Sequence, residues 1–272
     1  MPRWSRRKER TDIVTVREIE QFLFAWAPKE TAASWDNVGH LVGEQEQKVE
    51  RVLVALDITP DVIREAIDGT YDLIVSHHPF INCAWNPVQT IRGDDQQGRG
   101  LIDLIRARVS AICMHTNLDI AQGGVNDVLA AKLGLTQTEV MAGGDGIVRV
   151  GVLEKEFALP EFLSYVREQL KPNGIRFADG GRKVCRVAVG GGACGEYFRA
   201  AAACGCDTFV TSDVKYNQFL DAKELGLNLI DAGHYPTEDG ICSAIAQRLS
   251  EKFPGLTIQK STSHQEVIQY YI

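Results

Sequence analysis

Four of the six histidines in this 272-residue chain stand where an apolar, β-rich stretch gives way to polar residues: His77, His78, His115 and His234. Carboxylates follow two of these stretches closely. Asp119 comes four residues after His115, and Glu238 comes four residues after His234. Imidazole nitrogens and carboxylate oxygens are together typical ligands of zinc, manganese, iron, cobalt or nickel. The residue types therefore indicate metal chemistry.

The positions of these side chains favour one shared site. A lone strand-end histidine is more often satisfied by a backbone partner, but four of six at such positions reverse that preference. Ligand sites in parallel α/β sheets gather outside the carboxyl ends of strands. Since one carboxylate can bridge two ions about 3.5–4 Å apart, we predict two divalent metal ions with five ligands: His77, His78, Asp119, His234 and Glu238.

His115 lies outside this ligand set and is the candidate catalytic residue, because a histidine beside the ligands would orient one of them or transfer a proton. Asp57 ends the run VALD, and Asp213 follows the corresponding run TFVTS in the second half. For both aspartates a helix cap or surface position and a role in the site are equally open. Asp36, in the loop SWDNVGHLVG, is more typical of a structural turn.

The elements that must position these residues alternate between strand and helix. The short β-rich runs VLVALD, DLIVSH and SAICMH are separated by the helix-like stretches TPDVIREAI and GRGLIDLIRAR, and a second such series begins near Ile147. Near the start, Thr15 and Glu18 have the spacing of a capping box before a helix that Pro28 follows. This alternation predicts the α/β class with mainly parallel central sheets.

The two halves resemble each other at an offset of 135 positions, for example at Asp72 and Asp207, which predicts two related lobes. We place a basic tail at 1–12, a first lobe at 13–142 and a second lobe at 143–272. This division leaves open that the last helix and strand pack back on the first lobe.

Composition narrows the class of protein. The net charge of -7 argues against unspecific nucleic-acid or acidic-membrane binding. Neither a membrane-spanning run nor a signal peptide is recognisable, so we expect a cytoplasmic protein. The cysteines form no CxxC pair and are interpreted as reduced, buried thiols rather than a disulfide framework: Cys83, Cys113, Cys185, Cys194, Cys204, Cys206 and Cys242.

Five sequence blocks resemble one known family when taken together: SWDNVGHLVG, RVLVALDITPDVIREAI, DLIVSHHPFI, MHTNLDIAQGGVNDVLAAKLGL and DAGHYPTE. The family comprises proteins related to the yeast NGG-one-interacting factor, often called GTP cyclohydrolase 1 type 2 homologues. The resemblance implies a dinuclear metal site on the same five residues, two lobes around a central metal cleft, and a ring-like homohexamer. The chain is similar to the short form without an inserted domain. His40 and Asn217 depart from the family pattern.

The resemblance also implies a reaction, in which metal-bound hydroxide attacks C8 of GTP and formate is released. Two alternatives stay open. The same metals would serve a phosphoesterase acting on a nucleotide or another small-molecule substrate. A regulator or scaffold that binds metal without catalysis would carry the same ligands, because no guanine-binding or triphosphate-binding motif is present.

Overall fold

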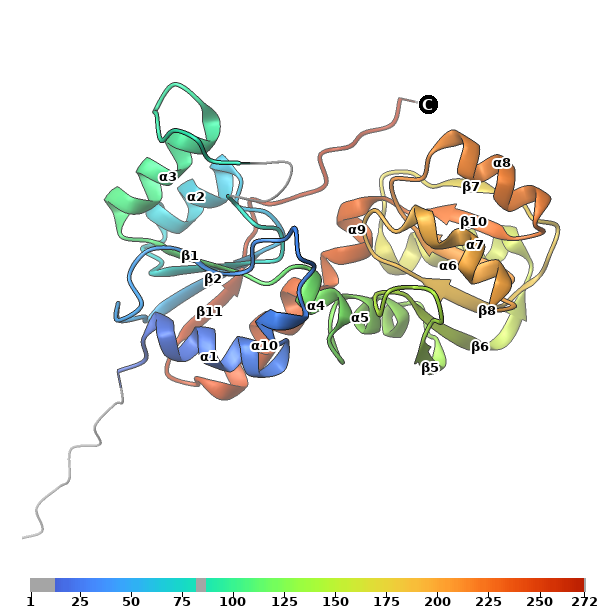
Figure 1. Ribbon diagram of the computed structural model, residues 1–272, viewed down its shortest axis with the longest axis horizontal. Helices are drawn as coiled ribbons and strands as arrows, with labels where there is room; N and C mark the ends of the chain where they lie inside the picture. The colour runs from blue at the N-terminus through green and yellow to red at the C-terminus, as the bar shows by residue number, and fades with distance from the viewer. Residues whose placement is uncertain (1–12, 82–86, 272) are drawn as a thin grey trace, which may run out of the picture.

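Two β-sheets, each covered by helices on both faces, form two lobes that lie side by side (Figure 1). The computed structural model describes residues 13–81 and 87–271; the predicted tail at 1–12 and Cys83 lie outside the described residues. The predicted α/β class with two lobes is confirmed.

The first lobe is built on a five-stranded sheet in the order β1-β4-β3-β2-β11. Only the β1–β4 pairing is antiparallel. The strands are β1 (Gly39–Val42), β2 (Arg51–Ala55), β3 (Leu73–Ser76), β4 (Ser110–Cys113) and β11 (Thr257–Lys260). Strands β3 and β4 are buried along their whole length, as expected of parallel strands with both faces covered.

Four helices cover this sheet. Helices α1 (Val16–Trp26) and α10 (Gly240–Lys252) pack on one face, and α2 (Pro60–Asp68) and α3 (Gln96–Ala107) on the other. Helix α1 begins as predicted, with a capping box between Thr15 and Glu18, and it buries Ile19 and Leu23. A short 3-10 turn, η1 (Lys29–Thr31), follows it.

The second lobe contains a six-stranded sheet in the order β5-β6-β8-β9-β10-β7. Its centre, β8-β9-β10, is parallel, whereas β5, β6 and β7 add to it by antiparallel pairings. The short link between β5 and β6 allows only an antiparallel pair. The strands are β5 (Thr136–Val140), β6 (Arg149–Phe157), β7 (Arg176–Ala178), β8 (Val184–Val189), β9 (Thr208–Thr211) and β10 (Asn228–Asp231).

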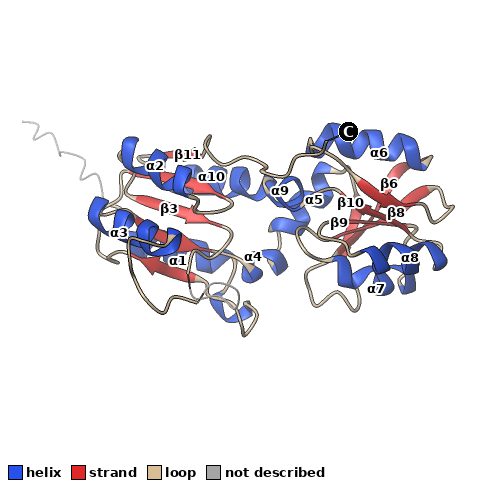
Figure 2. Cartoon of the chain, turned by 90° about the horizontal axis from the view of Figure 1, so that it is seen from above, coloured by secondary structure: helices blue, strands red, loops and turns tan. Residues whose placement is uncertain are grey.

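Helices again lie on both faces of this sheet (Figure 2). One face packs against α5 (Val125–Lys132) and α6 (Leu159–Leu170). The other packs against α7 (Phe198–Ala203) and α8 (Tyr216–Glu224), with the 3-10 turn η2 (Gly195–Tyr197) leading into α7. Both lobes are therefore three-layered.

Each lobe contains a helix and a strand from the half of the chain that mainly forms the other lobe. After β4, the short helix α4 (Thr116–Ile120) leads into α5 and β5, which join the second lobe. After β10, the short helix α9 (His234–Glu238) leads into α10 and β11, which return to the first lobe. Figure 1 shows this exchange as green α5 in one lobe and red α10 in the other. Strand β5 thus belongs to the second sheet although it precedes position 143.

The repeat predicted from sequence has a counterpart in the hydrogen bonds. The carboxylate of Asp72 accepts from the backbone N–H groups of Glu50 and Arg51. The carboxylate of Asp207 accepts in the same way from Cys185 and Arg186, the residues 135 positions later. Each aspartate therefore fastens the start of the strand that precedes it, which supports a shared strand–helix–strand unit.

Among residues 13–81 and 87–271, no helix combines the length and apolar character needed to cross a membrane.

Candidate metal centre

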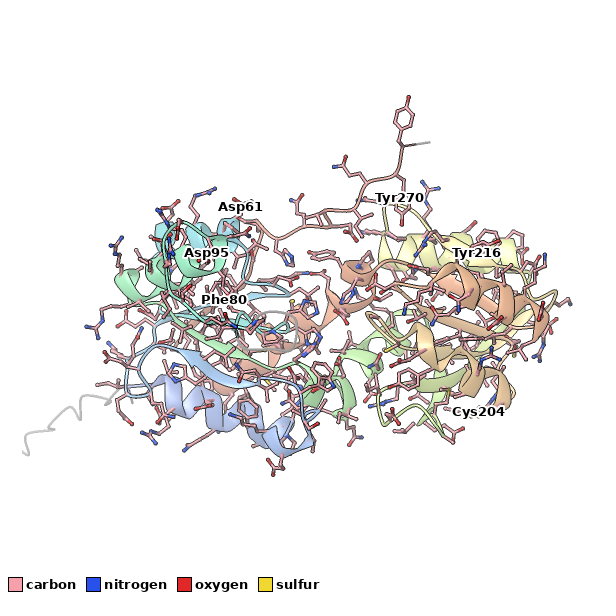
Figure 3. All side chains as sticks on the ribbon, turned by 45° about the horizontal axis from the view of Figure 1, so that its top comes forward. Asp61, Phe80, Asp95, Cys204, Tyr216 and Tyr270 are labelled. Atoms are coloured by element: carbon pink, nitrogen blue, oxygen red, sulfur yellow. The ribbon has the colours of Figure 1, made fainter. Side chains whose placement is uncertain are left out.

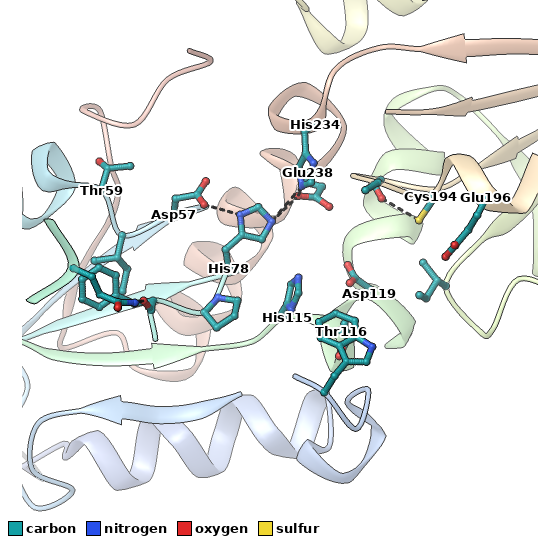
Figure 4. A pocket seen from close by; sticks show the side chains of 18 of the residues that line it. Asp57, Thr59, His78, His115, Thr116, Asp119, Cys194, Glu196, His234 and Glu238 are labelled. Atoms are coloured by element: carbon teal, nitrogen blue, oxygen red, sulfur yellow. Dashed lines mark hydrogen bonds and ion pairs between the residues drawn. The ribbon is translucent and has the colours of Figure 1, made fainter. Parts of the chain in front are cut away.

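The predicted ligands converge between the lobes, where strands end and two short helices begin. Figure 4 shows four of the five: His78, Asp119, His234 and Glu238. His77 and His78 directly follow β3, and Asp119 lies on α4. His234 and Glu238 are the first and last residues of α9. One side of the centre therefore comes from the first lobe and the other from the turn after β10.

The five side chains form two groups of potential metal ligands that share Glu238. One group contains His77, Asp119 and Glu238, and the other contains His78, His234 and Glu238. In the second group, Oε2 of Glu238 lies 3.1 Å from Nε2 of His78 and 3.1 Å from Nε2 of His234. In the first, Nε2 of His77 lies 3.6 Å from Oδ1 of Asp119 and 3.9 Å from Oε2 of Glu238. The geometry would allow Glu238 to bridge two ions.

These spacings fit the donor set of a metal ion. Four ligands about 2.1 Å from one ion in a tetrahedral arrangement are about 3.4 Å from one another. Among the described residues, Nε2 of His77 is buried without a hydrogen-bond partner. Buried polar atoms are normally satisfied, so this unpaired nitrogen, which faces Asp119 and Glu238, fits a ligand of a metal ion.

The histidine rings are held by their other nitrogen. Nδ1 of His77 donates to the carbonyl of Met114 at 2.9 Å. Nδ1 of His78 donates to Asp57 at 2.8 Å, and Nδ1 of His234 donates to Asp213 at 2.6 Å. Because the hydrogen is on Nδ1, the neutral ring presents its Nε2 lone pair to the centre. This is the usual arrangement around metal-bound histidines.

The pKa values of the three candidate histidine ligands are shifted in opposite directions. Burial lowers the pKa of His77 to about 3. Burial also opposes charge on His78 and His234, but Asp57, Asp213 and Glu238 outweigh it and raise their pKa values to about 10 and about 11.

The carboxylates are perturbed in opposite directions. Burial raises the pKa of Asp119 to about 7, and nearby Glu238 adds to this shift. For Glu238 burial acts in the same direction, but the charges and hydrogen bonds of His234 and His78 prevail and hold its pKa well below the usual range. Without metal, the cluster therefore carries protons that metal ions would displace.

His115 lies beside this cluster rather than within the shared pair of groups. It forms a further potential group with His77 and His78. Its Nδ1 is 2.9 Å from Oδ1 of Asp36, whose other oxygen accepts from the backbone and hydroxyl of Thr116. Asp36 is thus more than a structural turn, because it fixes the ring of the candidate catalytic histidine.

Three further residues lie at the site. The sequence left the role of two of them open and did not indicate the third. Asp57 and Asp213 orient His78 and His234, and these roles settle the choice left open between cap and site. His264 reaches Asp57 from the C-terminal segment, with its Nε2 3.2 Å from Oδ2. No motif surrounds His264, and only its contact in space reveals it.

Other candidates lie elsewhere. His40 is in β1 and Asn217 is in α8, and neither lines the pocket described below. Of the six described cysteines, all free thiols, four are buried as predicted, whereas Cys185 and Cys204 are partly exposed. Cys206 is buried in the core of the second lobe, while Cys194 lines the pocket and donates to the carbonyl of Gly191.

A pocket of about 800 Å³ opens over the centre between the lobes. Trp35, Phe80 and Tyr197 provide aromatic walls, and Glu196 adds a carboxylate on the side of the second lobe. Lysine and arginine do not occur among its lining residues within the described chain. The pocket suits a small organic molecule with a flat, apolar part.

Comparison with known proteins agrees with this architecture. Proteins named GTP cyclohydrolase 1 type 2 homolog from Clostridium perfringens and a Nostoc species are 32% and 35% identical; the alignments cover 83% and 82% of this chain and 87% and 85% of theirs. A Staphylococcus aureus hypothetical protein of solved structure is 28% identical with a TM-score of 0.87, covering 96% of this chain and all of that one. Residues 14–266 match the family described as Duf34/NIF3 (NGG1p interacting factor 3). The chain belongs to this family.

Proposed function

We propose that the protein is a hydrolase that depends on two divalent metal ions held by His77, His78, Asp119, His234 and Glu238. The observation that carries the proposal is the position of Glu238, shared by two groups of potential ligands at the floor of a pocket. Bound divalent ions would lower the pKa of water and polarise the group under attack.

The chain's own residues have separate tasks in this proposal. His78 and His234 are fixed by Asp57 and Asp213, so that their Nε2 atoms face Glu238. His115, oriented by Asp36, is placed to accept a proton from the attacking water or deliver one to the leaving group. Trp35, exposed over about half its surface, offers a face on which a ring could stack.

The names of the relatives point to GTP, whose ring would open after attack at C8 with release of formate. If C8 lies at the metals, the triphosphate must lie along pocket walls whose described lining residues include no lysine or arginine to bind it. A phosphoester would instead place its phosphate on the metals and would require no further cation. The lack of cationic side chains among the described lining residues therefore favours a phosphoesterase as the second candidate.

The deciding experiment measures formate and inorganic phosphate together, with GTP as substrate and protein reconstituted with manganese or zinc. The Asp119→Ala variant removes a proposed ligand, and Asp68→Ala, an exposed carboxylate of α2, is the matched control. Formate release lost only in Asp119→Ala would support attack at C8, and phosphate alone would support the phosphoesterase. Neither product from fully loaded protein would exclude GTP and favour a metal-binding regulator.

Metal binding is expected to strengthen steeply with pH. His78 and His234, with pKa values of about 10 and about 11, are protonated at neutral pH in the metal-free protein and must lose these protons to bind metal. Two displaced protons imply an association constant that rises roughly 100-fold per pH unit between about pH 7.5 and 9. Competition with a chromophoric chelator at several pH values measures this slope. A pH-independent constant would show that neither histidine gives up a proton.

The homohexamer and the cytoplasmic location implied earlier stay predictions. They do not enter the argument for the metal centre, because every residue used in it belongs to a single chain.

A further inference from the structure

The segment that follows β11 leaves the first lobe and crosses to the second (Figure 1, Figure 3). At its start, the carboxylate of Glu65 on α2 accepts from the backbone N–H groups of Thr262 and Ser263. Near its end, the side-chain amide of Asn173 donates to the carbonyl of Ile268 at 2.7 Å. The ring of Tyr270 lies against Gly174 in the second lobe. We call residues 261–271 the C-terminal strap, since it is fixed to both lobes.

Between these anchors the strap places His264 at the edge of the metal centre. The side chain of His264 is only 9% exposed. Its ring meets that of Tyr235 edge to face, with centroids 5.0 Å apart, and the hydroxyl of Tyr235 donates to the carbonyl of His264 at 3.0 Å. Tyr235 follows His234 directly, so α9 fixes both the candidate ligand and the strap.

The contact of His264 is with the carboxylate that orients His78. Oδ2 of Asp57 lies 3.2 Å from Nε2 of His264, and its Oδ1 lies 2.8 Å from Nδ1 of His78. The side chain of Asp57 is 42% exposed, so the carboxylate is open to solvent on part of its surface. A second partner on Oδ2 restricts rotation of the carboxylate and holds Oδ1 toward His78.

We propose that His264 is a positioning residue of the metal centre: through Asp57 it fixes the ring of His78 and so sets the affinity of the group formed by His78, His234 and Glu238. The inference rests on the proposed metal centre. It assigns a task to the strap, because the strap carries His264 to Asp57 and Tyr235. In the other group, His77 and Asp119 lie outside this chain of contacts, since His77 is oriented by the backbone of Met114, and only Glu238 is shared.

The test compares His264→Ala, His264→Gln and the neighbouring control Gln265→Ala in zinc titrations of the full chain against a chromophoric chelator. Partners of this kind typically change metal affinity 10–100-fold. We expect one of two bound zinc ions to bind about tenfold or more weakly in His264→Ala and the other to keep its affinity. His264→Gln, which retains a donor for Asp57, should recover part of the loss.

The outcomes separate this inference from the metal centre itself. Two zinc ions bound with unchanged affinity by His264→Ala would overturn the role of His264 and leave the metal centre intact. Equal weakening of both ions, with a lower melting temperature of the metal-free variant, would indicate general loosening and also overturn it. If the unaltered chain binds no zinc, the proposed metal centre fails, and the inference fails with it.

Discussion

Glu238→Gln is expected to abolish the binding of both metal ions while the chain stays folded. Glutamine keeps the shape of the side chain but removes the charge, and it replaces one of the two oxygens with a donor that cannot bind a cation. Oε2 of Glu238 lies 3.1 Å from Nε2 of His78 in one group and 3.9 Å from Nε2 of His77 in the other, so the loss affects both groups. Outer partners of metal ligands alone change metal affinity about 10–100-fold, so loss of a shared ligand is expected to weaken binding by more than about a hundredfold.

Metal content after dialysis, together with a zinc titration, measures this effect. Glu196→Gln is the matched control, because this carboxylate lines the same pocket but belongs to neither group. It should retain two ions. One ion retained at full affinity in Glu238→Gln would contradict a shared carboxylate and place Glu238 at a single metal.

Gly192→Ala is expected to disrupt the centre through the backbone rather than through a ligand. Gly192 has φ +62°, and a Cβ atom at this position would lie 2.1 Å from Oε1 of Glu238 and 3.1 Å from Nε2 of His234. The glycine is also held in place, since its N–H donates to the hydroxyl of Thr237 and its carbonyl accepts from the N–H of Ser212. Glu238 must therefore move out of position.

The left-handed conformation alone costs a non-glycine residue about 1–2 kcal/mol. Gly181→Ala isolates this cost, because Gly181 has φ +74° and a Cβ there would meet nothing within 4 Å. We expect a modest drop in melting temperature for both variants but loss of zinc binding only for Gly192→Ala. Equal zinc binding by the two variants would mean that the centre tolerates a shifted Glu238.

The sequence predicted most of the fold because parallel strands buried on both faces are continuous apolar runs. DLIVSH and SAICMH contain β3 and β4, and each ends at the edge where His77, His78 and His115 emerge. The five predicted ligands came together for the same reason. Their role as ligands stays a prediction, whereas their proximity is a property of the fold.

Two features were beyond the reach of local patterns. Asp57 and Asp213 follow strands, a position shared by helix caps and site residues, so their type alone left the choice open. The contact between Asp57 and His264 joins residues 207 positions apart. Neither residue carries a periodicity or motif that indicates the other. Likewise, an amphipathic helix such as α6 shows which face it buries but not which sheet it will cover.

The exchange of α5 with β5 and of α10 with β11 bears on how the chain matures during synthesis. The first sheet lacks its β11 edge and the cover of α10 until residues 240–260 have left the ribosome. The apolar faces of β2 and α1 therefore stay partly exposed to solvent until α10 and β11 have been synthesised and have packed against them. Neither half is a self-sufficient folding unit, so a break in the chain between them would leave two aggregation-prone fragments rather than two working domains.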